Sequence, residues 1–540
     1  MSMIFTGITG LNAAQTALNV TSKNIAGVGV NGYSRQVANF KTSDIGGVYI
    51  NNIERVSDQY AVQQAWFNAT QYGYDTTNAS HNLQLETLVS GKNTSLSPSL
   101  NGFFDTLNAA SADPMEIAYR QEVLADAEDL ASRFNSLSSS MNKQAADVES
   151  QLSSLTGEAN DMLASIAKTN EAIAAAAAIG NVPSHLLDER DQSIQQLSEL
   201  MDVSIIFEQD QTATVTIPTG EPLVSRGETN ELVLLPGYPD ASQTQLAVKS
   251  HDATKRIDQP GGGIGGLMDF REDTLSQSQR ELDRLALAFS NEVNALMEKG
   301  FDLNGAAGSA LFGDINSSEL MRNRSTHIGG TNSVNLDIKV DDTSKLTADN
   351  YVFSKNDKNE LEVHRHPGGE KVDFETDTTT GDISFDGITI SAADGKTLGD
   401  MAAGSSYLIE PGKGAAGTME VVLDDPEKLA FSGKADEPGN NSNLLDLIKL
   451  QDKTIAGGQS VNQGWNSIIS DVASSSARAT NSLAASEMLY QEATSRVQSE
   501  SGVNLDEEAG NMLMFQQLYS ANAKVISTAD ELFQTLLQAV

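Results

Sequence analysis

The sequence predicts a mainly α-helical protein with inserted antiparallel β domains: N- and C-terminal heptad helices pack as a coiled coil, and a long helical-bundle stalk carries outer β domains. Three observations support this fold class. No proline occurs before Pro98, between Pro114 and Pro183, or after Pro438, so long helices fit in these gaps, because proline removes a backbone donor and clashes with the preceding turn. Both ends of the chain repeat large apolar residues every seven positions. In the middle of the chain the hydrophobic period changes to two, which is typical of strands.

The N-terminal helix is expected to pack closely against another helix. Its large apolar residues recur every seven positions, and the small side chains of Ala14 and Thr21 lie between them. Small side chains allow a second helix to approach. The candidate assembly residues at this end are Ile4, Leu11, Leu18 and Ile25.

A second coiled-coil pattern lies inside the chain, where apolar residues from Met141 to Ile173 alternate steps of four and three. It predicts a helix from about Met141 to Ala178, roughly 57 Å long. A helix of this length needs partners along its side. Shorter apolar stripes in 187–201, 275–296 and 465–497 could supply them, and antiparallel packing of these segments is the simplest arrangement.

Strands are expected in two regions between the helices. Period-two alternation occurs around Val215 and again in 334–340. Asp386-Gly387 lies between two short alternating runs and predicts a hairpin with a primed turn. The expected domains are 1–45 with 500–540 as a terminal coiled-coil assembly domain, 46–202 with 265–330 and 436–499 as a helical rod-like domain, 203–264 as a small inserted β domain, and 331–435 as an inserted antiparallel β domain.

The C-terminal helix carries the most regular pattern. Large residues recur every seven positions over five heptads, and Gly510 within this helix costs about 1 kcal/mol relative to alanine. Burying each large side chain contributes about 1.5–3 kcal/mol, but ordering the backbone costs about 1–2 kcal/mol per residue, so two lone helices are marginal. Either the stripes cover a core of the monomer, or neighbouring subunits complete them. The candidate assembly residues are Leu505, Met512, Tyr519, Ile526, Phe533 and Val540.

Composition excludes several classes of function. With 35 Lys and Arg against 73 Asp and Glu, the net charge of -38 would repel nucleic acid and anionic lipid surfaces. The chain has no cysteine, which excludes disulfides and cysteine nucleophiles. No apolar run is long enough for a membrane helix, and the first residues lack the basic and continuous apolar regions of a signal peptide. We therefore expect neither membrane insertion nor ordinary signal-peptide secretion.

No motif predicts an enzyme, a metal site or a cofactor. Gly261, Gly263 and Gly266 have dinucleotide-loop spacing, but the preceding residues are too polar for a buried strand, so a flexible helix entry is expected. The segment after Asp302 lacks the ligands of a calcium loop. His364 and His366 could share a strand face, yet no second ligand cluster is near them in the sequence, which favours surface histidines.

Residues 19–36 read NVTSKNIAGVGVNGYSRQ, and this segment resembles the sequence shared by bacterial flagellar rod, hook and hook-associated axial proteins. It departs from the usual pattern at Gly27, Gly29 and Val30, where Asn and Thr are commoner in the family. Its glycines and asparagines suit a chain reversal after a helix, and its tyrosine suits an amphipathic anchor. The residues that match the family pattern are Asn24, Ile25, Ala26, Gly32, Tyr33, Ser34, Arg35 and Gln36.

The C-terminal segment 502–537 and two internal segments, 186–205 and 265–305, are similar to the same family. The resemblance implies a structural subunit of the junction between hook and filament, which self-assembles into a ring through its terminal helices and is required for filament assembly and motility. It implies contacts with other copies of itself, with hook protein, with the second junction hook-associated protein and with flagellin. It also implies secretion by flagellar type III export, an extracellular location, and a cytoplasmic export chaperone at the C-terminal helix.

Two other classes of function stay open at this point. A secreted coiled-coil surface adhesin with a central β binding domain would form stable trimers rather than junction rings. A cell-wall hydrolase would need a catalytic constellation, for which the sequence gives no support.

Overall fold

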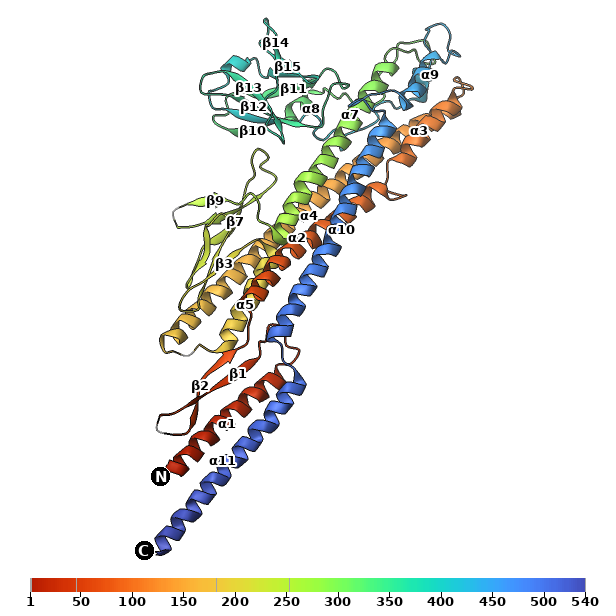
Figure 1. Ribbon diagram of the computed structural model, residues 1–540. Helices are drawn as coiled ribbons and strands as arrows, with labels where there is room; N and C mark the ends of the chain where they lie inside the picture. Colours follow the sequence, from red (N-terminus) through yellow and green to blue (C-terminus); the bar gives the residue numbers. More distant parts are fainter. Residues whose placement is uncertain (1, 45, 181, 252, 540) are drawn as a thin grey trace.

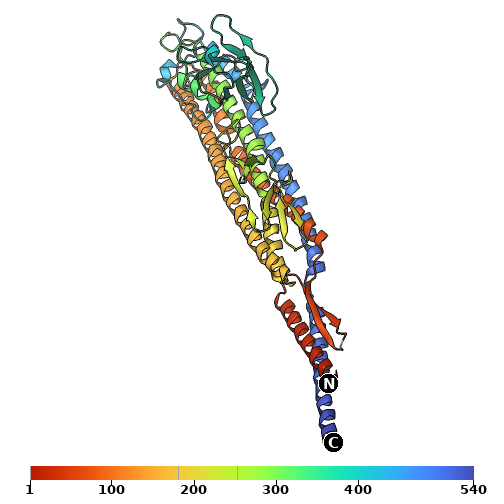
Figure 2. The same ribbon diagram turned by 90° about the vertical axis from the view of Figure 1, so that its left-hand side faces the viewer.

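The computed structural model describes residues 2–44, 46–180, 182–251 and 253–539. Both views show an elongated molecule whose two ends lie at one extremity, with the β domains beside a helical rod and at its far end (Figure 1, Figure 2). The chain runs out along the rod and returns along it. The predicted fold class, mainly α with antiparallel β domains and paired terminal helices, is confirmed.

The terminal domain consists of two helices and a hairpin. Helices α1 (Ser2–Ala26) and α11 (Leu505–Ala539) pack side by side in opposite directions (Figure 1). Strands β1 (Gln36–Thr42) and β2 (Val48–Arg55) pair antiparallel with an irregularity between Asn39 and Phe40, and they contact α1. The hairpin therefore continues to Arg55, beyond the expected domain boundary at residue 45.

The rod is a bundle of long helices. Helix α4 begins soon after Pro114 and spans 62 residues, so it starts well before the expected Met141. Helix α2 begins at the N-cap Asp58, whose carboxylate accepts hydrogen bonds from the N–H groups of Tyr60 and Ala61. The helices are α2 (Gln59–Ser90), α3 (Ser97–Ala110), α4 (Ile117–Ala178), α5 (Ser184–Leu200), α6 (Gly262–Asp269), the π-helix η1 (Phe270–Ser276), α7 (Gln277–Met297), α9 (Ser442–Ile448), η4 (Lys449–Gln451) and α10 (Val461–Ser501).

The rod core is built from large side chains. Phe289 lies edge-on to Phe103 and Phe104, with ring centroids 5.8 and 6.3 Å away. Trp465 is 1% exposed, and its Nε1 donates a hydrogen bond of 3.1 Å to Ser95 Oγ. Such aromatic pairs contribute beyond their buried area, so the bundle is held by its own side chains.

The small β domain contains two antiparallel sheets of four and three strands. Val215 and Leu246 belong to the same apolar cluster as the rod helices, and Asn170 of α4 binds the backbone of Ala213 through both its donor and its acceptor. This domain is thus packed onto the rod. Its strands are β3 (Ser204–Phe207), β4 (Ala213–Thr216), β5 (Pro222–Ser225), β6 (Glu228–Thr229), β7 (Glu231–Leu235), β8 (Gln245–Lys249) and β9 (Thr254–Arg256).

The upper β domain has two four-stranded antiparallel sheets around a core of its own. The predicted hairpin is present: Ile383 pairs with Ile390, and Asp386 and Gly387 both have positive φ, as a type I′ turn requires. The strands begin at Ser325, before the expected boundary at 331. The elements are α8 (Ser318–Asn323), β10 (Ser325–Gly329), β11 (Leu336–Val340), β12 (Asn350–Lys355), β13 (Leu361–His366), β14 (Glu375–Thr376), β15 (Ile383–Phe385), β16 (Ile388–Ala392), η2 (Leu398–Asp400), β17 (Ser406–Ile409) and, after it, η3 (Pro426–Lys428).

Candidate assembly surface

Helices α1 and α11 meet through small residues on α1. A Cβ added to Gly7 would lie 2.6 Å from Ile526 Cγ1, and one added to Gly10 would lie 2.4 Å from Asn522 Oδ1. The missing side chains therefore let α11 rest directly against the α1 backbone. This face of α1 alternates steps of three and four, which are positions a and d of a heptad. It comprises Gly7, Gly10, Ala14, Ala17, Thr21 and Asn24.

The α11 side of this contact carries larger residues with the same heptad spacing. Of the predicted assembly residues, Met512, Tyr519 and Ile526 are half-buried on this face. Leu505 and Phe533, at its two ends, are 51% and 55% exposed, and Val540 lies outside the described residues. The face comprises Glu508, Met512, Phe515, Tyr519, Asn522, Ile526 and Ala529.

The predicted assembly residues of α1 lie beside the contact with α11 rather than at its centre. They occupy heptad position e, next to the face of small residues, and all are half-buried. On α1, small side chains therefore lie at the centre of the contact and large ones lie beside it. These residues are Ile4, Leu11, Leu18 and Ile25.

Many large apolar side chains of the terminal domain face outward. The C-terminal part of α11 extends beyond the start of α1 (Figure 1), and there Leu537 is 64% exposed. Exposed apolar clusters of this kind mark interaction sites. The others are Met3, Phe5, Ile8, Val37, Phe40, Tyr49, Ile53, Leu513, Met514, Leu518, Val525 and Leu532.

The loop that resembles the axial-protein pattern is held by Asn24. The Asn24 Nδ2 donates to Gln36 O at 2.9 Å and to Glu508 Oε2 at 3.1 Å. Its Oδ1 accepts hydrogen bonds of 2.9 Å from Tyr33 Oη and from Gln36 N. One asparagine, 1% exposed, thereby joins the end of α1, the start of β1 and the start of α11. We call Asn24, Tyr33, Gln36 and Glu508 the hub.

Charged residues next to the hub attach it to the rod. Arg35 donates its backbone N–H to Ser501 O at 2.8 Å and pairs with Glu507 at 2.6 Å. Arg55 pairs with Asp188 at 3.1 Å and with Asp191 at 2.6 Å. Because α5 carries both aspartates, the hairpin is tied to the rod as well as to α1. The carboxylate of Asp188 also accepts a hydrogen bond of 3.4 Å from Ser34 N.

Burial alters the acid–base behaviour of this region. Burial, together with the carboxylates of Asp188 and Glu508, raises the pKa of Tyr33 to about 12, so its hydroxyl remains a donor at neutral pH. Burial also raises the pKa of Asp188, although Ser34 and Arg55 oppose the shift. A Cβ on Gly27 would lie 2.7 Å from the Tyr33 ring, so a glycine there allows the ring to pack against the backbone.

The remaining matched residues of the loop have structural positions. Ile25 is half-buried, and Ala26 is the last residue of α1 and is exposed. Gly32 has a φ of +78° and lies near Gln192 of α5, which favours glycine. The loop therefore positions elements relative to one another, and it brings no catalytic groups together.

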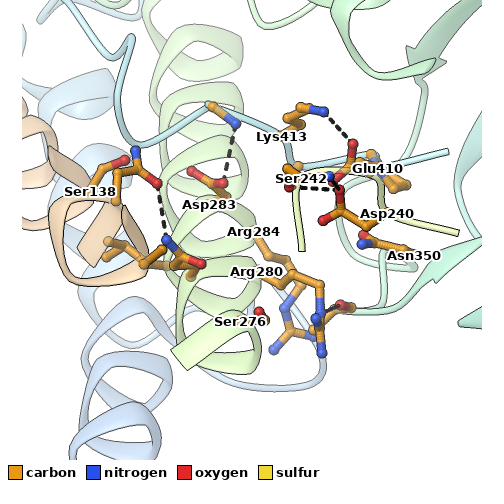
Figure 3. Close-up of a pocket in the computed structure, with 18 of the residues that line it drawn as sticks. Ser138, Asp240, Ser242, Ser276, Arg280, Asp283, Arg284, Asn350, Glu410 and Lys413 are labelled. Carbon is orange, nitrogen blue, oxygen red and sulfur yellow. Dashed lines mark hydrogen bonds and ion pairs between the residues drawn. The ribbon is translucent and has the colours of Figure 1, made fainter. Parts of the chain in front are cut away.

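A cleft lies away from the terminal domain, between the rod and the two β domains. It has a volume of about 730 Å³ and is lined by α4, α7 and loops of both β domains (Figure 3). Its lining contains the ion pairs of Arg271 with Glu149 at 2.5 Å and of Lys413 with Glu410. Burial raises the pKa of Asp283 to about 7, although the N–H groups of Gly414 and Ala416 donate to its carboxylate. The hydrogen bonds to Asp283 attach the loop after β17 to helix α7 of the rod.

The glycines with dinucleotide-loop spacing serve packing. A Cβ on Gly266 would lie 2.4 Å from Tyr74 O, and Gly262, within the same run, is equally close to the backbone of α5. Asp302 caps a turn by accepting from the N–H groups of Asn304 and Ala306. Among the described residues, no group of three or more His, Asp or Glu could hold a metal ion, and no described helix is long and apolar enough to cross a membrane.

Three segments of the chain match known families. Residues 83–312 match the family described as Flagellar hook-associated protein FlgK helical domain, residues 325–411 match Flagellar hook-associated protein 1, D2-like domain, and residues 495–539 match Flagellar basal body rod FlgEFG protein C-terminal. The Flagellar hook-associated protein 1 of Escherichia coli (strain K12) is 30% identical over 555 residues, which cover 99% of each chain. The chain belongs to the flagellar hook-associated protein 1 family.

Further comparisons agree with this family. The protein of the same name from Salmonella typhimurium is 30% identical over 566 residues, again covering 99% of each chain. A solved structure of the flagellar hook junction protein FlgK from Burkholderia pseudomallei shares the fold, with a TM-score of 0.69, 19% identity, and coverage of 81% of this chain and all of that one. The chain is therefore a hook-associated component of the bacterial flagellum. None of these relatives supports the adhesin alternative.

Sequence reasoning missed two parts of the assembly surface in this hook-associated protein. Ala14 and Thr21 were predicted to allow the close approach of a helix, and both lie on the contact face of α1. The rest of that face was missed because glycine and alanine add little to an apolar stripe; the spacing from Gly7 to Asn24 was the available signal. Asp188 and Glu508 were also missed, because each meets the loop from far away in the sequence.

Proposed function

We propose that this chain forms the junction between hook and filament as a ring of identical subunits joined through their terminal domains. One side of the ring would bind hook protein, and the other would bind the second junction hook-associated protein and, through it, flagellin. Filament assembly and motility would depend on this ring. The role is structural, without catalysis.

The terminal domain supports this proposal best. Its helices pair through small residues and keep large apolar side chains at the surface, as Leu537 and Ile8 illustrate. Isolated proteins rarely expose apolar clusters of this extent unless a partner covers them. The described residues of α1 and α11 contribute nothing to the two large apolar cores, so these helices are available for assembly.

The exposed apolar residues of α11 also have a consequence for export of the chain. We propose that the chain leaves the cell unfolded through the flagellar export apparatus and reaches the extracellular flagellum, and that a cytoplasmic chaperone binds α11 before export. The regular apolar spacing of α11, with Leu518 and Leu532 exposed, would promote association of unassembled chains. A chaperone that covered this helix would prevent it.

Deletion of residues 504–540 tests the proposed function. Cells carrying the deletion should export flagellin into the medium, make no filaments and lose motility. A control variant that shortens the exposed turn between Thr376 and Ile383 of the upper β domain should keep its filaments. Retained motility in the deletion strain would contradict the proposal, and a normal thermal transition of the purified deletion variant would show that the rod remains folded.

A further inference from the structure

The pair of terminal helices has apolar residues on two opposite sides. On α1, the flank that includes Ala13 and Val20 faces the β1–β2 hairpin, since both residues are buried and a Cβ on the hairpin residue Gly47 would lie 2.2 Å from Thr9 Oγ1. The opposite flank carries large apolar side chains. We call this second flank the far-side surface; it comprises Ile4, Ile8, Leu11 and Leu18.

The apolar flank of α11 lies on the hairpin side. In an antiparallel helix pair, equivalent flanking positions of the two heptads lie on the same side. Leu518, Val525 and Leu532 occupy position g of α11, as Ala13 and Val20 do in α1. The ring of Phe40 in β1 lies 5.9 Å from that of Phe515, which places the hairpin beside this flank. We call Phe40, Met514, Leu518, Val525 and Leu532 the hairpin-side surface; all five are exposed.

Both surfaces are free of charge in a strongly acidic chain. Lys23 is the one charged residue among the 25 of α1, and the hairpin-side surface has none. The whole chain has a net charge of -38, so two copies repel each other over most of their area. A second copy can approach without charge repulsion where both surfaces are neutral and apolar. This favours another copy of the chain as the occupant.

We infer that the far-side surface of one copy packs against the hairpin-side surface of the next. The two surfaces differ and lie on opposite sides of the same helix pair. Such a contact is head-to-tail and repeats from copy to copy, which generates a ring or a helical array rather than a closed dimer. This inference rests on the proposed function and specifies which faces of the subunits meet.

Cysteine cross-linking in assembled flagella tests the inference, and the native chain has no cysteine that would interfere. Leu11→Cys and Leu518→Cys would be combined in one chain, and hook–filament particles would be treated with a short thiol cross-linker. A disulfide or short linker joins only residues whose Cβ atoms are close. We expect a ladder of multimers from the double variant and single subunits from each single variant. The pair Ile8→Cys with Val525→Cys should behave in the same way.

The matched control replaces Leu518→Cys by Gln517→Cys, the neighbouring exposed position on another face of α11. Leu11→Cys with Gln517→Cys should give no ladder. Dimers from either single variant would show that like surfaces meet and would overturn the inference. Normal filaments without any cross-link from the double variants would also overturn it while the proposed function stood. If the unmodified protein were absent from the junction, the proposed function itself would fail.

Discussion

The terminal helix pair and the rod bundle are built from the same kind of helix, but they place their large side chains oppositely. In the rod, Phe289 is 1% exposed and packs among other aromatic rings. In the terminal pair, glycines and alanines form most of the α1 side of the contact, and Phe533 of α11 is 55% exposed. The rod therefore satisfies its apolar surface within one chain. The terminal pair leaves much of that surface to partners.

The rod and the terminal pair differ in what stabilises them: burial within one chain for the rod, and assembly with other molecules for the terminal pair. The rod should fold at any concentration, because burial of its core depends on no second molecule. The terminal pair gains little from burial within the chain, so its order should increase with assembly. The hub lies where the terminal pair meets the rod, and its neighbours Arg35 and Arg55 connect the two regions by hydrogen bonds and ion pairs rather than by an apolar core.

The largest expected difference comes from one residue type changed in both regions. Phe289→Ala should destabilise the rod by about 3–5 kcal/mol, since it removes a fully buried ring and leaves a cavity. Phe533→Ala should change unfolding by less than about 0.5 kcal/mol, because the ring is exposed. Urea unfolding followed by far-ultraviolet circular dichroism measures both. Equal losses of stability from the two substitutions would contradict the outward placement of Phe533.

The hub can be weakened without touching the rod core. Asn24→Ala removes four hydrogen bonds and leaves the buried Glu508 carboxylate without this donor, which should cost about 2–3 kcal/mol. Hydrogen exchange should speed up in α1 and α11 and remain unchanged in α4. The exposed Asn12→Ala on α1 serves as the control. Uniform acceleration along the chain would contradict a local role for the hub.

Two glycine substitutions compare a tight contact with an open position. Gly7→Ala places a Cβ against Ile526 and should loosen α11 by about 1–2 kcal/mol, since overpacking exceeds the gain in helix propensity. Gly510→Ala meets no atom within 4 Å and should stabilise α11 by about 1 kcal/mol. Hydrogen exchange of α11 amides measures both. Stabilisation by Gly7→Ala would show that the helices are not in close contact.

A small effect is expected at Tyr33. Tyr33→Phe removes one hydrogen bond to Asn24 and should cost about 1 kcal/mol at neutral pH. Because the folded pKa of about 12 exceeds the ordinary value near 10, the contribution of Tyr33 to stability should be complete below pH 10 and decline as pH rises toward 12. Phenolate absorbance should lose its step near pH 12 in the variant. Loss of a step near pH 10 instead would contradict the buried environment.

The sequence predicted features that repeat and failed on features that depend on distant segments. The seven-residue spacing of Met512, Tyr519 and Ile526 was visible because large apolar residues mark it. On α1 the spacing of large apolar residues selected Leu11 and Leu18, which lie beside the contact with α11. The α1 side of the contact itself consists mostly of small residues. Gly510, which the sequence places inside the C-terminal stripe, faces open space.

Contacts between segments that are distant in the sequence could be identified only from the folded structure. Glu508 meets Asn24 across 484 positions of sequence, and the cleft near Asp283 combines five separate stretches of the chain. A buried carboxylate beside an asparagine has no periodicity that a sequence could display. The hairpin at Asp386-Gly387 was predictable for the opposite reason, because its turn and its two strands are adjacent.

The out-and-back path of the chain has a consequence for how such a molecule can change. The chain leaves the terminal domain along α2 and returns to it along α10 (Figure 1). All residues between these two helices therefore form one insertion that starts and ends next to the hub. Lengthening, trimming or exchanging the distal β domains would leave the spacing of α1 and α11 as it was. The sequences and sizes of the β domains can therefore vary while the geometry of the two terminal helices is preserved.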